Sequence, residues 1–312
     1  MNPSNSAPPR IAVVLLHWKN EDDTLACLES LKAQEGISLR LLVIFNGPTS
    51  DVPNRLLQVV PSESFMVAGR NLGYAGGNNV AMQKVLDEGY DQILVLNNDT
   101  VLAPDCLLHL CRAARAEPNV GAVAPKSYYL SRRDIIYFAG GRISPEGYTE
   151  HVGVGLPDGP QYDQAADCDW LTGCAILFRA EALRRVGLFE PRYFLCYEDS
   201  DWCLRARRAG YRLRYAPEAR LWHKVSPNFG QTWSPSYTYY FTRNNLWWIE
   251  RNFPPGRRPA LYRHALARIQ WLTASARPAM SPTVAAGVAA AIRAGVRDYV
   301  LRRFGQRHTG LE

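Results

Sequence analysis

The chain has 312 residues and a formal net charge of +7; 47% of its residues are hydrophobic and 21% are charged. This composition is typical of a folded globular protein and argues against a disordered or membrane-spanning chain. The seven cysteines form no CxxC pair, so they predict neither a disulfide framework nor a zinc site and fit a reducing cytosol.

The first part of the chain alternates short apolar runs with helical segments. Residues 1–10 are polar and proline-rich, and we expect them to be disordered rather than to form a signal peptide. We predict strands at residues 11–16, 39–45, 65–67, 93–96 and 121–124, and helices at about 22–34, 76–88 and 104–116. This alternation predicts an α/β fold, with helices on both faces of a mostly parallel sheet and ligands at the carboxyl ends of its strands.

The second part of the chain is less regular. Residues 127–167 are rich in Gly, Tyr and Pro and are predicted to form hairpins and loops. An apolar stretch follows, and then short helices, a strand and a helical C-terminal region; the ranges are 169–178, 180–186, 201–209, 212–215 and the residues beyond 237.

Two acidic features point to chemistry. Asn97, Asn98 and Asp99 close an apolar strand, and Glu198 and Asp199 come just before a predicted helix. A carboxylate at the end of a strand and an acidic pair at the start of a helix are what metal-assisted sugar transfer from a nucleotide donor requires. Each feature alone also has a simpler explanation, an Asn/Asp turn in one case and favourable charge at a helix N-terminus in the other.

Five segments together resemble one enzyme family. They occur in the order VVLLHWKN, NLGYAGGNN, VLNNDTVLAPD, WLTGCAILFRAEAL and YFLCYEDSDWCLRARRAGYRLRYAPEARLWHK. They resemble motifs of the family 2 inverting glycosyltransferases, especially the rhamnosyltransferase-like branch. The resemblance covers residues 11–250 and implies a GT-A fold, a Rossmann-like domain with a donor-binding half at 11–125 and an acceptor-side half at 126–250.

The resemblance implies a divalent cation, Mn²⁺ or Mg²⁺. Asp99 occupies the position of the carboxylate that holds the cation on the donor diphosphate, and His223 matches a histidine that can complete the metal shell. Because Asn97 and Asn98 leave a single carboxylate in the motif, metal affinity is expected to depend on the phosphates of the donor. An imidazole ligand suits manganese better than magnesium.

The resemblance also implies the catalytic residue. Asp199 matches the base that takes the proton of the acceptor hydroxyl as it attacks the anomeric carbon opposite the leaving diphosphate. Glu198 is expected to bind acceptor hydroxyls. Asp201 is assigned to structure instead, because Arg205 lies four residues further along the helix and can pair with it.

Donor and acceptor residues follow from the matched motifs. The implied donor-binding residues are His17, Lys19, Asn20, Asn46, Asn71, Gly73, Gly76, Gly77, Asn78, Asn97 and Asn98. Glycines in this set are expected to let the backbone approach the donor, with a helix opening at Gly76 and Gly77 toward a phosphate. The implied acceptor-binding residues are Trp170, Thr172, Gly173 and Glu198, although a tryptophan in an apolar stretch can equally be core.

One residue departs from the family pattern. Phe45 stands where many relatives carry an aspartate that reads the pyrimidine base. Base recognition would then use Asn46, Asp51 or backbone groups. The choice between uridine and thymidine is therefore open at this level.

The C-terminal extension, residues 251–312, is basic and helical. It carries eleven arginines against two acidic residues, a local charge of +9. Val284, Val288, Ile292, Val296 and Tyr299 recur at helical spacing. This amphipathic pattern fits contact with an anionic membrane, packing against the catalytic domain, or contact with a second subunit in a homo-oligomer.

The resulting prediction is an enzyme that transfers a sugar from a nucleotide-sugar donor to a hydroxyl of a glycan acceptor. We expect rhamnose from dTDP-rhamnose, or UDP-galactofuranose or a UDP-hexose as donor, and a lipid-linked bacterial cell-surface glycan as acceptor. The expected location is cytoplasmic and peripheral to the inner face of the cell membrane. The alternatives are a sugar-nucleotide pyrophosphorylase and a basic nucleic-acid-binding protein, although no recognised nucleic-acid-binding motif accompanies the arginines and no nucleic acid is expected.

Overall fold

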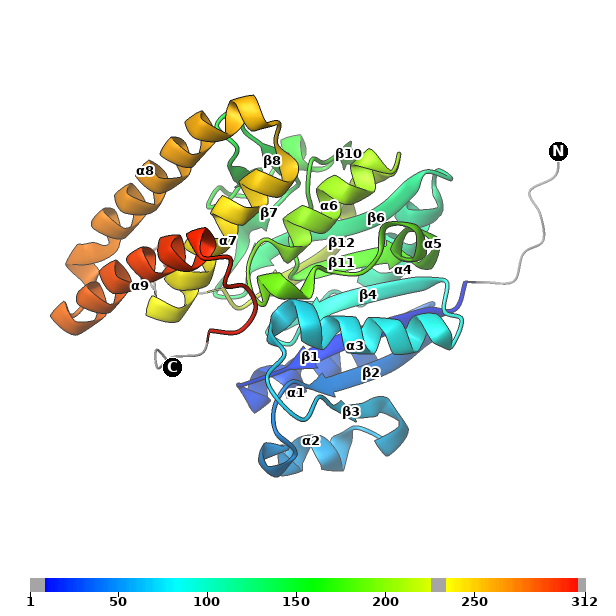
Figure 1. Ribbon diagram of the computed structural model, residues 1–312. Coiled ribbons are helices and arrows are strands. Elements are labelled where there is room, and N and C mark those ends of the chain that lie inside the picture. Colours follow the sequence, from blue (N-terminus) through cyan, green and yellow to red (C-terminus); the bar gives the residue numbers. More distant parts are fainter. Residues whose placement is uncertain (1–8, 226–233, 308–312) are drawn as a thin grey trace.

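The computed structural model describes residues 9–225 and 234–307, and the N-terminal segment predicted to be disordered falls largely outside these residues. The described residues form a large mixed sheet with helices packed against both of its faces, and a group of C-terminal helices to one side (Figure 1). This arrangement confirms the predicted α/β class.

The sheet runs in the order β10-β12-β6-β11-β4-β1-β2-β3. Its strands are β1 (Ile11–His17), β2 (Leu39–Phe45), β3 (Phe65–Val67), β4 (Gln92–Asn97), β6 (Val120–Tyr129), β10 (Ala166–Asp167), β11 (Ala175–Arg179) and β12 (Arg212–His223). Strands β3, β2, β1 and β4 are parallel neighbours, while β11 is antiparallel to both β4 and β6. The carboxyl ends of β1, β2 and β4 therefore meet at one edge.

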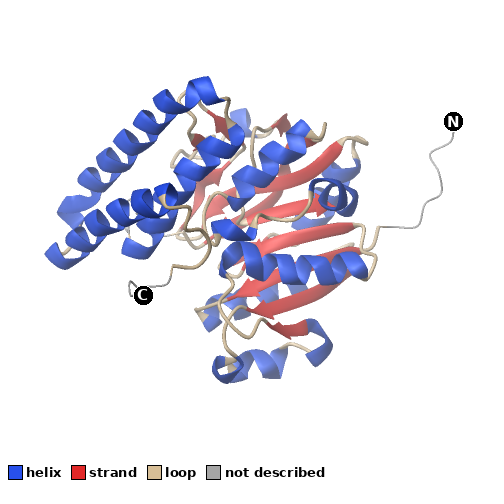
Figure 2. Cartoon of the chain, in the orientation of Figure 1, coloured by secondary structure: helices blue, strands red, loops and turns tan. Residues whose placement is uncertain are grey.

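Shorter strands complete the architecture. β5 (Thr100–Leu102) pairs with the end of β12, β7 (Arg132–Phe138) pairs with β6, and β8 (Gly141–Ile143) forms a hairpin with β9 (Thr149–His151). β7, β8 and β9 lie in the region predicted to form hairpins and loops. The helices of this part are α1 (Glu21–Lys32), α2 (Asn54–Val59), α3 (Gly73–Asp87), α4 (Cys106–Arg115), α5 (Ala180–Val186) and α6 (Glu198–Arg208), and Figure 2 shows them on both faces of the sheet.

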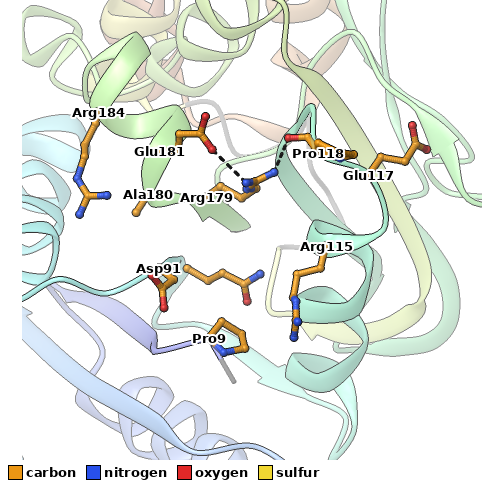
Figure 3. A pocket seen from close by; sticks show the side chains of 10 residues that line it. Pro9, Asp91, Arg115, Glu117, Pro118, Arg179, Ala180, Glu181 and Arg184 are labelled. Carbon is orange, nitrogen blue, oxygen red and sulfur yellow. Dashed lines mark hydrogen bonds and ion pairs between the residues drawn. The ribbon is translucent and has the colours of Figure 1, made fainter. Parts of the chain in front are cut away.

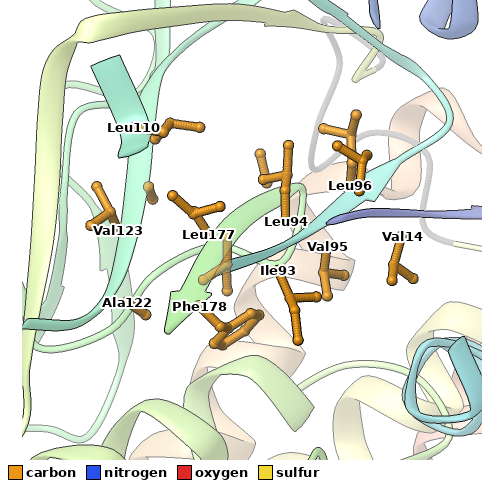
Figure 4. Packing of buried hydrophobic residues seen from close by; sticks show 14 of the residues in the cluster. Val14, Ile93, Leu94, Val95, Leu96, Leu110, Ala122, Val123, Leu177 and Phe178 are labelled. Carbon is orange, nitrogen blue, oxygen red and sulfur yellow. The ribbon is translucent and has the colours of Figure 1, made fainter. Parts of the chain in front are cut away.

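The core lies between the central strands and these helices. Every residue of β1 is buried, as expected of a parallel strand covered on both faces. Leu94 and Val95 of β4 are fully buried, and so are Leu177 and Phe178 of β11 (Figure 4). This close packing makes the central sheet a rigid base for the residues at its carboxyl edge.

Helix α6 and strand β12 both extend further than predicted, and the extra residues matter for the site. Helix α6 begins at Glu198 rather than at 201, directly after Tyr197, whose φ of 72° ends the preceding loop. Strand β12 continues to His223, because after a register shift its second half pairs with β6 on one side and β5 on the other. Both differences bring acidic or imidazole groups into the site.

The C-terminal helices are α7 (Pro235–Asn252), α8 (Arg258–Ala276) and α9 (Pro282–Val300). Gly295 of α9 lies against the backbone of α7, where an added Cβ would be 2.9 Å from the carbonyl oxygen of Tyr239. Val288, in the middle of the predicted apolar stripe, is buried and packs with Tyr237 and Phe241. Of the predicted stripe, Val288 is therefore buried, Ile292, Val296 and Tyr299 are half-buried, and Val284 is exposed. No helix among the described residues is long and apolar enough to cross a membrane.

Candidate active site

Side chains at the end of β1 hold one another in place. The Nδ1 atom of His17 is 2.6 Å from the hydroxyl of Thr24, and the amide of Asn98 donates to that same hydroxyl and to the carbonyl of Lys19. His17 is buried, and burial lowers its pKa. His17 thus supports the edge of the sheet, whereas Lys19 and Asn20 are exposed there.

Asn46 joins the end of β2 to the start of α3. Its side chain donates to Asn71 and to the carbonyl of Gly73, and it accepts from the backbone of Leu72. Asn46 is buried, and both its amide nitrogen and its amide oxygen are hydrogen-bonded within the protein, so few of its polar atoms are available to bind a base. The structure therefore argues against Asn46 as a direct base reader.

The glycines of the Gly-rich turn are required by packing. Helix α3 begins at Gly73, not at Gly76 as predicted, and Gly73 has a φ of 72° with no room for a Cβ beside the carbonyl of Phe194. A Cβ on Gly77 would be 2.6 Å from Leu16. Asn78 is fully buried and donates to the carbonyl of Tyr74, so the expected donor contact of its side chain does not fit this position.

Phe45, the departure from the family pattern, turns inward. Its ring stacks on that of His17 with the centroids 5.7 Å apart, and it is buried. A Cβ on Gly47 would be 2.6 Å from this ring. Phe45 therefore contributes packing, and no polar side chain replaces the missing aspartate at this position.

Asp99 and His223 come together across 124 positions of the sequence. The Nε2 atom of His223 is 3.0 Å from Oδ1 of Asp99 because β12 pairs with β5 at this point. Burial opposes charge on both groups, but the hydrogen bond between them lowers the pKa of Asp99 and, with the aspartate charge, raises the pKa of His223 to about 10. In the absence of a cation, the two groups form an ion pair.

These two residues fit a divalent cation. One carboxylate and one imidazole are oxygen and nitrogen donors that suit manganese. Asn97 lies beside them, and its Oδ1 is buried without a hydrogen-bond partner. Among the described residues, no group of three or more His, Cys, Asp or Glu side chains is arranged to hold a metal. Two protein ligands leave the remaining positions to a donor diphosphate and water.

Glu198 and Asp199 begin α6 and face a cavity. The carboxylate of Asp199 accepts from the backbone N–H of Gly173 at 2.8 Å and from the N–H and hydroxyl of Ser200 at 2.6 and 3.0 Å. Glu198 is 5% exposed, and its Oε2 has no hydrogen-bond partner. Within the acidic pair, the carboxylate of Asp199 therefore accepts three hydrogen bonds, whereas Oε2 of Glu198 accepts none from the described residues.

Burial raises the pKa of both members of the pair. The charge of Asp199 raises the pKa of Glu198 further, to well above its ordinary value, while the hydrogen bonds from Gly173 and Ser200 oppose the rise for Asp199. Two neighbouring buried carboxylates titrate together and resist double ionisation. Asp199 is therefore the member favoured to be ionised, and Glu198 the member favoured to keep a proton.

Asp201 lies on the other side of the same helical turn. Arg205 donates to its Oδ2 at 2.9 Å, Arg251 to its Oδ1 at 3.0 Å, and Tyr193 and Asn252 also donate to it. It is fully buried, yet Arg251 and Arg205 outweigh burial and lower its pKa. The predicted pairing with Arg205 is present.

Helix α7 holds the loop that leads into the acidic pair, and sequence reasoning missed this role. Asn244 donates to the carbonyls of Tyr193, Leu195 and Cys196 at 2.7–3.1 Å, and the buried Arg243 donates to Tyr193 at 3.0 Å. The loop needs this support because Phe194, Cys196 and Tyr197 all have positive φ. The Arg-Asn-Asn run of α7 was the available signal, but its partners lie about 50 residues away.

The cavity in front of the acidic pair has a volume of about 850 Å³. Trp170, Thr172 and Gly173, which were predicted to bind acceptor, line it together with Asn97 and His223. Trp170 is largely buried against Phe138 and His151, so it is a wall of the cavity as well as part of the core. The far wall comes from α7 and α8, which the sequence did not assign to the site.

A second cavity, of about 510 Å³, lies at the opposite edge of the sheet, where β4 begins (Figure 3). Its charged residues largely neutralise one another: Arg179 contacts Glu181 at 3.0 Å and also donates to the carbonyl of Pro118. It lies away from the carboxyl ends of the parallel strands, where α/β sheets bind ligands.

Comparison with known families agrees with this geometry. Residues 92–294, more than half of the chain, match a family described as "Glycosyl transferase family group 2", and residues 13–152 match "Glycosyl transferase family 2". The chain belongs to the family 2 glycosyltransferases. This membership confirms the enzyme class that the five motifs predicted, rather than a pyrophosphorylase or a nucleic-acid-binding protein.

Among curated proteins, this glycosyltransferase is similar to an N-acetylglucosaminyl-diphospho-decaprenol L-rhamnosyltransferase of Mycobacterium tuberculosis. The two are 27% identical over 271 residues, covering 77% of this chain and 86% of the relative. An O-antigen biosynthesis protein of Myxococcus xanthus is 26% identical over 75% of this chain, but the match covers 19% of that longer protein.

Solved structures share the fold of this glycosyltransferase. A mannosyltransferase of Pyrobaculum calidifontis in complex with GDP-Man and Mn²⁺ matches 97% of this chain and 86% of its own, with a TM-score of 0.54 and 17% identity. GalNAc-T7 with UDP, GalNAc and Mn²⁺ matches 78% of this chain and about half of its own, 49%, with a TM-score of 0.58 and 13% identity. The fold is GT-A, as predicted.

Proposed function

We propose that this protein is a metal-dependent inverting rhamnosyltransferase that transfers rhamnose from dTDP-rhamnose to a hydroxyl of a lipid-linked bacterial glycan. One observation carries the proposal. His223, which pairs with Asp99, lines the same cavity as Glu198 and Asp199, two carboxylates that form no ion pair with any described basic side chain. The sugar and the lipid-linked acceptor are suggested by the mycobacterial relative, whose name gives both a rhamnosyl transfer and a diphospho-decaprenol acceptor.

In this mechanism Asp99 and His223 would hold the cation, which would supply positive charge against the departing diphosphate. Asp199 Oδ1 or Oδ2 accepts the proton of the acceptor hydroxyl as its oxygen attacks the anomeric carbon from the face opposite the diphosphate. Gly173 and Ser200 orient this carboxylate through their hydrogen bonds. Protonated Glu198 can donate a hydrogen bond to a neighbouring acceptor oxygen.

The donor-side residues divide by exposure. Lys19 and Asn20 are exposed, and Asn71, Gly76, Asn97 and Asn98 are partly exposed at the carboxyl edge of the sheet. We assign donor contacts to this group. The buried residues His17, Asn46, Gly73, Gly77 and Asn78 support it from beneath.

A panel of donors tests the proposal. Binding and slow hydrolysis of dTDP-rhamnose, UDP-galactofuranose, UDP-glucose and GDP-mannose are measured with Mn²⁺, with Mg²⁺ and with chelator. Metal-dependent selection of dTDP-rhamnose is expected, and it should be lost in Asp99→Ala. Selection of another donor would correct the sugar, and binding of none would contradict the transferase mechanism proposed for this site.

We also propose that the C-terminal helices contact an anionic membrane. Arg263 and Arg293 are exposed, and Trp271 is 66% exposed on α8. Full-length protein should co-sediment with phosphatidylglycerol vesicles but not with phosphatidylcholine vesicles, and Arg263→Glu combined with Arg293→Glu should abolish co-sedimentation. Equal sedimentation of that variant with phosphatidylglycerol would contradict membrane contact. Truncation is a poor test because α9 packs against α7.

A further inference from the structure

The C-terminal helices form part of the cavity that contains the acidic pair. Helix α8 contributes Ala265, Arg268, Ile269 and Leu272 to its lining, and α7 contributes Tyr237, Phe241 and Asn245. The extension is therefore a wall of the site opposite the catalytic domain. A ligand that reaches Asp199 through this cavity passes along α8.

Arg268 is the one arginine or lysine among the residues that line this cavity. Two histidines also line it, but burial lowers the pKa of His151 to about 4, and His223 is bound to Asp99. Within residues 9–225 and 234–307, no carboxylate lies within ion-pairing distance of Arg268. The cavity thus holds one guanidinium that forms an ion pair with none of the carboxylates in its lining, Glu150, Glu198 and Asp199.

The guanidinium of Arg268 is held in position by an aromatic ring. Its Cζ atom is 4.1 Å from the ring centroid of Tyr148, and the hydroxyl of Tyr148 donates to the carbonyl of His264 at 2.8 Å. This cation–π contact places the guanidinium over the ring, and none of its N–H groups forms a hydrogen bond to a described residue. A planar, oriented donor without a counter-ion suits a phosphate group.

Apolar side chains continue beside this cation. Ile269 and Leu272 follow Arg268 on α8 and line the same cavity, with Phe241 of α7. Leu272 and Phe241 belong to one apolar cluster with Val288 of α9. The surface next to Arg268 therefore suits a hydrocarbon chain attached to the phosphate.

We infer that Arg268 binds a phosphate of the acceptor, so that the cavity selects sugars linked through phosphate or diphosphate to an apolar chain. The inference rests on the proposed function in taking this cavity as the acceptor site. Arg268 is then a specificity residue, and Tyr148 positions it. Helix α8 is the element that contacts the phosphate and the apolar chain to which the acceptor sugar is linked.

Binding of geranyl diphosphate by isothermal calorimetry tests this inference. Chelator is present throughout, so that no cation can hold the diphosphate at Asp99 and His223. Wild-type protein should bind geranyl diphosphate at least tenfold more tightly than geraniol. The substitution Arg268→Gln should lower the affinity for geranyl diphosphate at least tenfold. Arg268→Lys, which keeps the charge, should retain intermediate affinity.

Arg112→Gln is the matched control, because Arg112 is an exposed arginine on α4 that does not line the cavity. It should bind geranyl diphosphate as wild type does. Equal affinity of the wild type for geranyl diphosphate and geraniol, or unchanged affinity in Arg268→Gln, would overturn the inference. Binding of inorganic diphosphate as tight as that of geranyl diphosphate would overturn the apolar-chain part and point to a soluble phosphate.

The outcome is separable from that of the proposed function. Donor hydrolysis by the wild type requires no acceptor and reports on the metal and donor side alone. If hydrolysis fails while Arg268-dependent binding holds, the mechanism is wrong but the phosphate site stands. If donor hydrolysis succeeds and Arg268→Gln binds geranyl diphosphate as the wild type does, only the assignment of Arg268 as a phosphate site is wrong.

Discussion

The two faces of the first turn of α6 carry the same kind of group in opposite surroundings. On one face, Asp201 is buried among Arg205, Arg251, Tyr193 and Asn252, and its pKa is lowered. On the other face, Glu198 and Asp199 point to the cavity and form no ion pair with a cationic side chain of the described residues, and burial raises the pKa of both.

The presence or absence of arginine partners indicates which carboxylate stabilises the fold and which is suited to take up a proton. A buried carboxylate with two arginines is held ionised and has no capacity to take another proton at neutral pH. Buried carboxylates without a cation reduce stability when ionised, and a protein keeps such groups chiefly where their proton affinity is used. We therefore assign Asp201 to the stability of the fold and, in the proposed mechanism, the cavity-facing pair to the reaction.

The largest expected effect is on the cavity face. Asp199→Asn removes the proposed base without changing side-chain size, so kcat for sugar transfer should fall by about 10²–10⁴-fold. Donor binding should remain, because the donor contacts lie at the carboxyl edge of the sheet. Steady-state kinetics and donor calorimetry measure the two quantities, and turnover close to wild type would exclude Asp199 as the base.

On the buried face, Asp201→Asn should act on stability. It leaves Arg205 without a carboxylate partner among the described residues and Arg251 with only the longer contact to Glu190 at 3.8 Å, and breaking a buried pair costs about 3–5 kcal/mol. The sign of its pH dependence follows from the lowered pKa: Asp201 stabilises the wild type above the unfolded pKa, and this contribution is lost as pH falls through the folded pKa. Urea unfolding at several pH values measures both effects; an unchanged free energy of unfolding at pH 7 would contradict them.

The loop between the two faces depends on α7. Asn244→Ala removes the donor shared by three carbonyls, and unpaired buried carbonyls cost about 1–3 kcal/mol. We expect lower stability by about that amount and a lower kcat, because the loop positions Glu198 and Asp199. Exposed Asn54→Ala, at the start of α2, serves as the control in unfolding and kinetic assays. Unchanged kcat in Asn244→Ala would argue against control of the acidic pair by α7.

The smallest effect is expected for Glu198→Gln. Because the folded pKa of Glu198 is raised, the folded state binds its proton more tightly, and stability falls as pH rises between the unfolded and folded pKa values. Glutamine removes this penalty, so the variant should be more stable than the wild type at pH 7 and should show no gain at pH 4 or below. Thermal unfolding across this range measures the difference, and a loss of stability at pH 7 would contradict it.

The sequence was sufficient for the local features of the fold and site. β1 is a continuous apolar run and the asparagines at the end of β4 follow such a run, so both are visible in short windows. The pairing of Asp201 with Arg205 follows from helical spacing. Motif order extended this to the family and to the GT-A fold.

Features that depend on distant contacts were not accessible in the same way. Arg251 joins Asp201 from 50 residues away, and Asn244 reaches the catalytic loop across a similar separation. Arg268 enters the cavity only because α8 folds back over it. Burial of Asn46 and Asn78 also depends on packing between elements and cannot be seen in a short window. For this reason the sequence assigned both residues to the donor, although their buried side chains hydrogen-bond within the protein.

The pH–rate profile of sugar transfer tests the central claim most directly, measured as kcat/KM for the wild type and for Glu198→Gln. The account predicts that the wild-type rate falls on the acid side with an apparent pKa above the ordinary aspartate value of about 3.9, because burial raises the pKa of Asp199. This limb should stay at the same pH in Glu198→Gln, because Glu198 is protonated and carries no charge while Asp199 titrates. An acid limb that disappears or moves to lower pH in Glu198→Gln would contradict Asp199 as the base and as the member of the pair that ionises first.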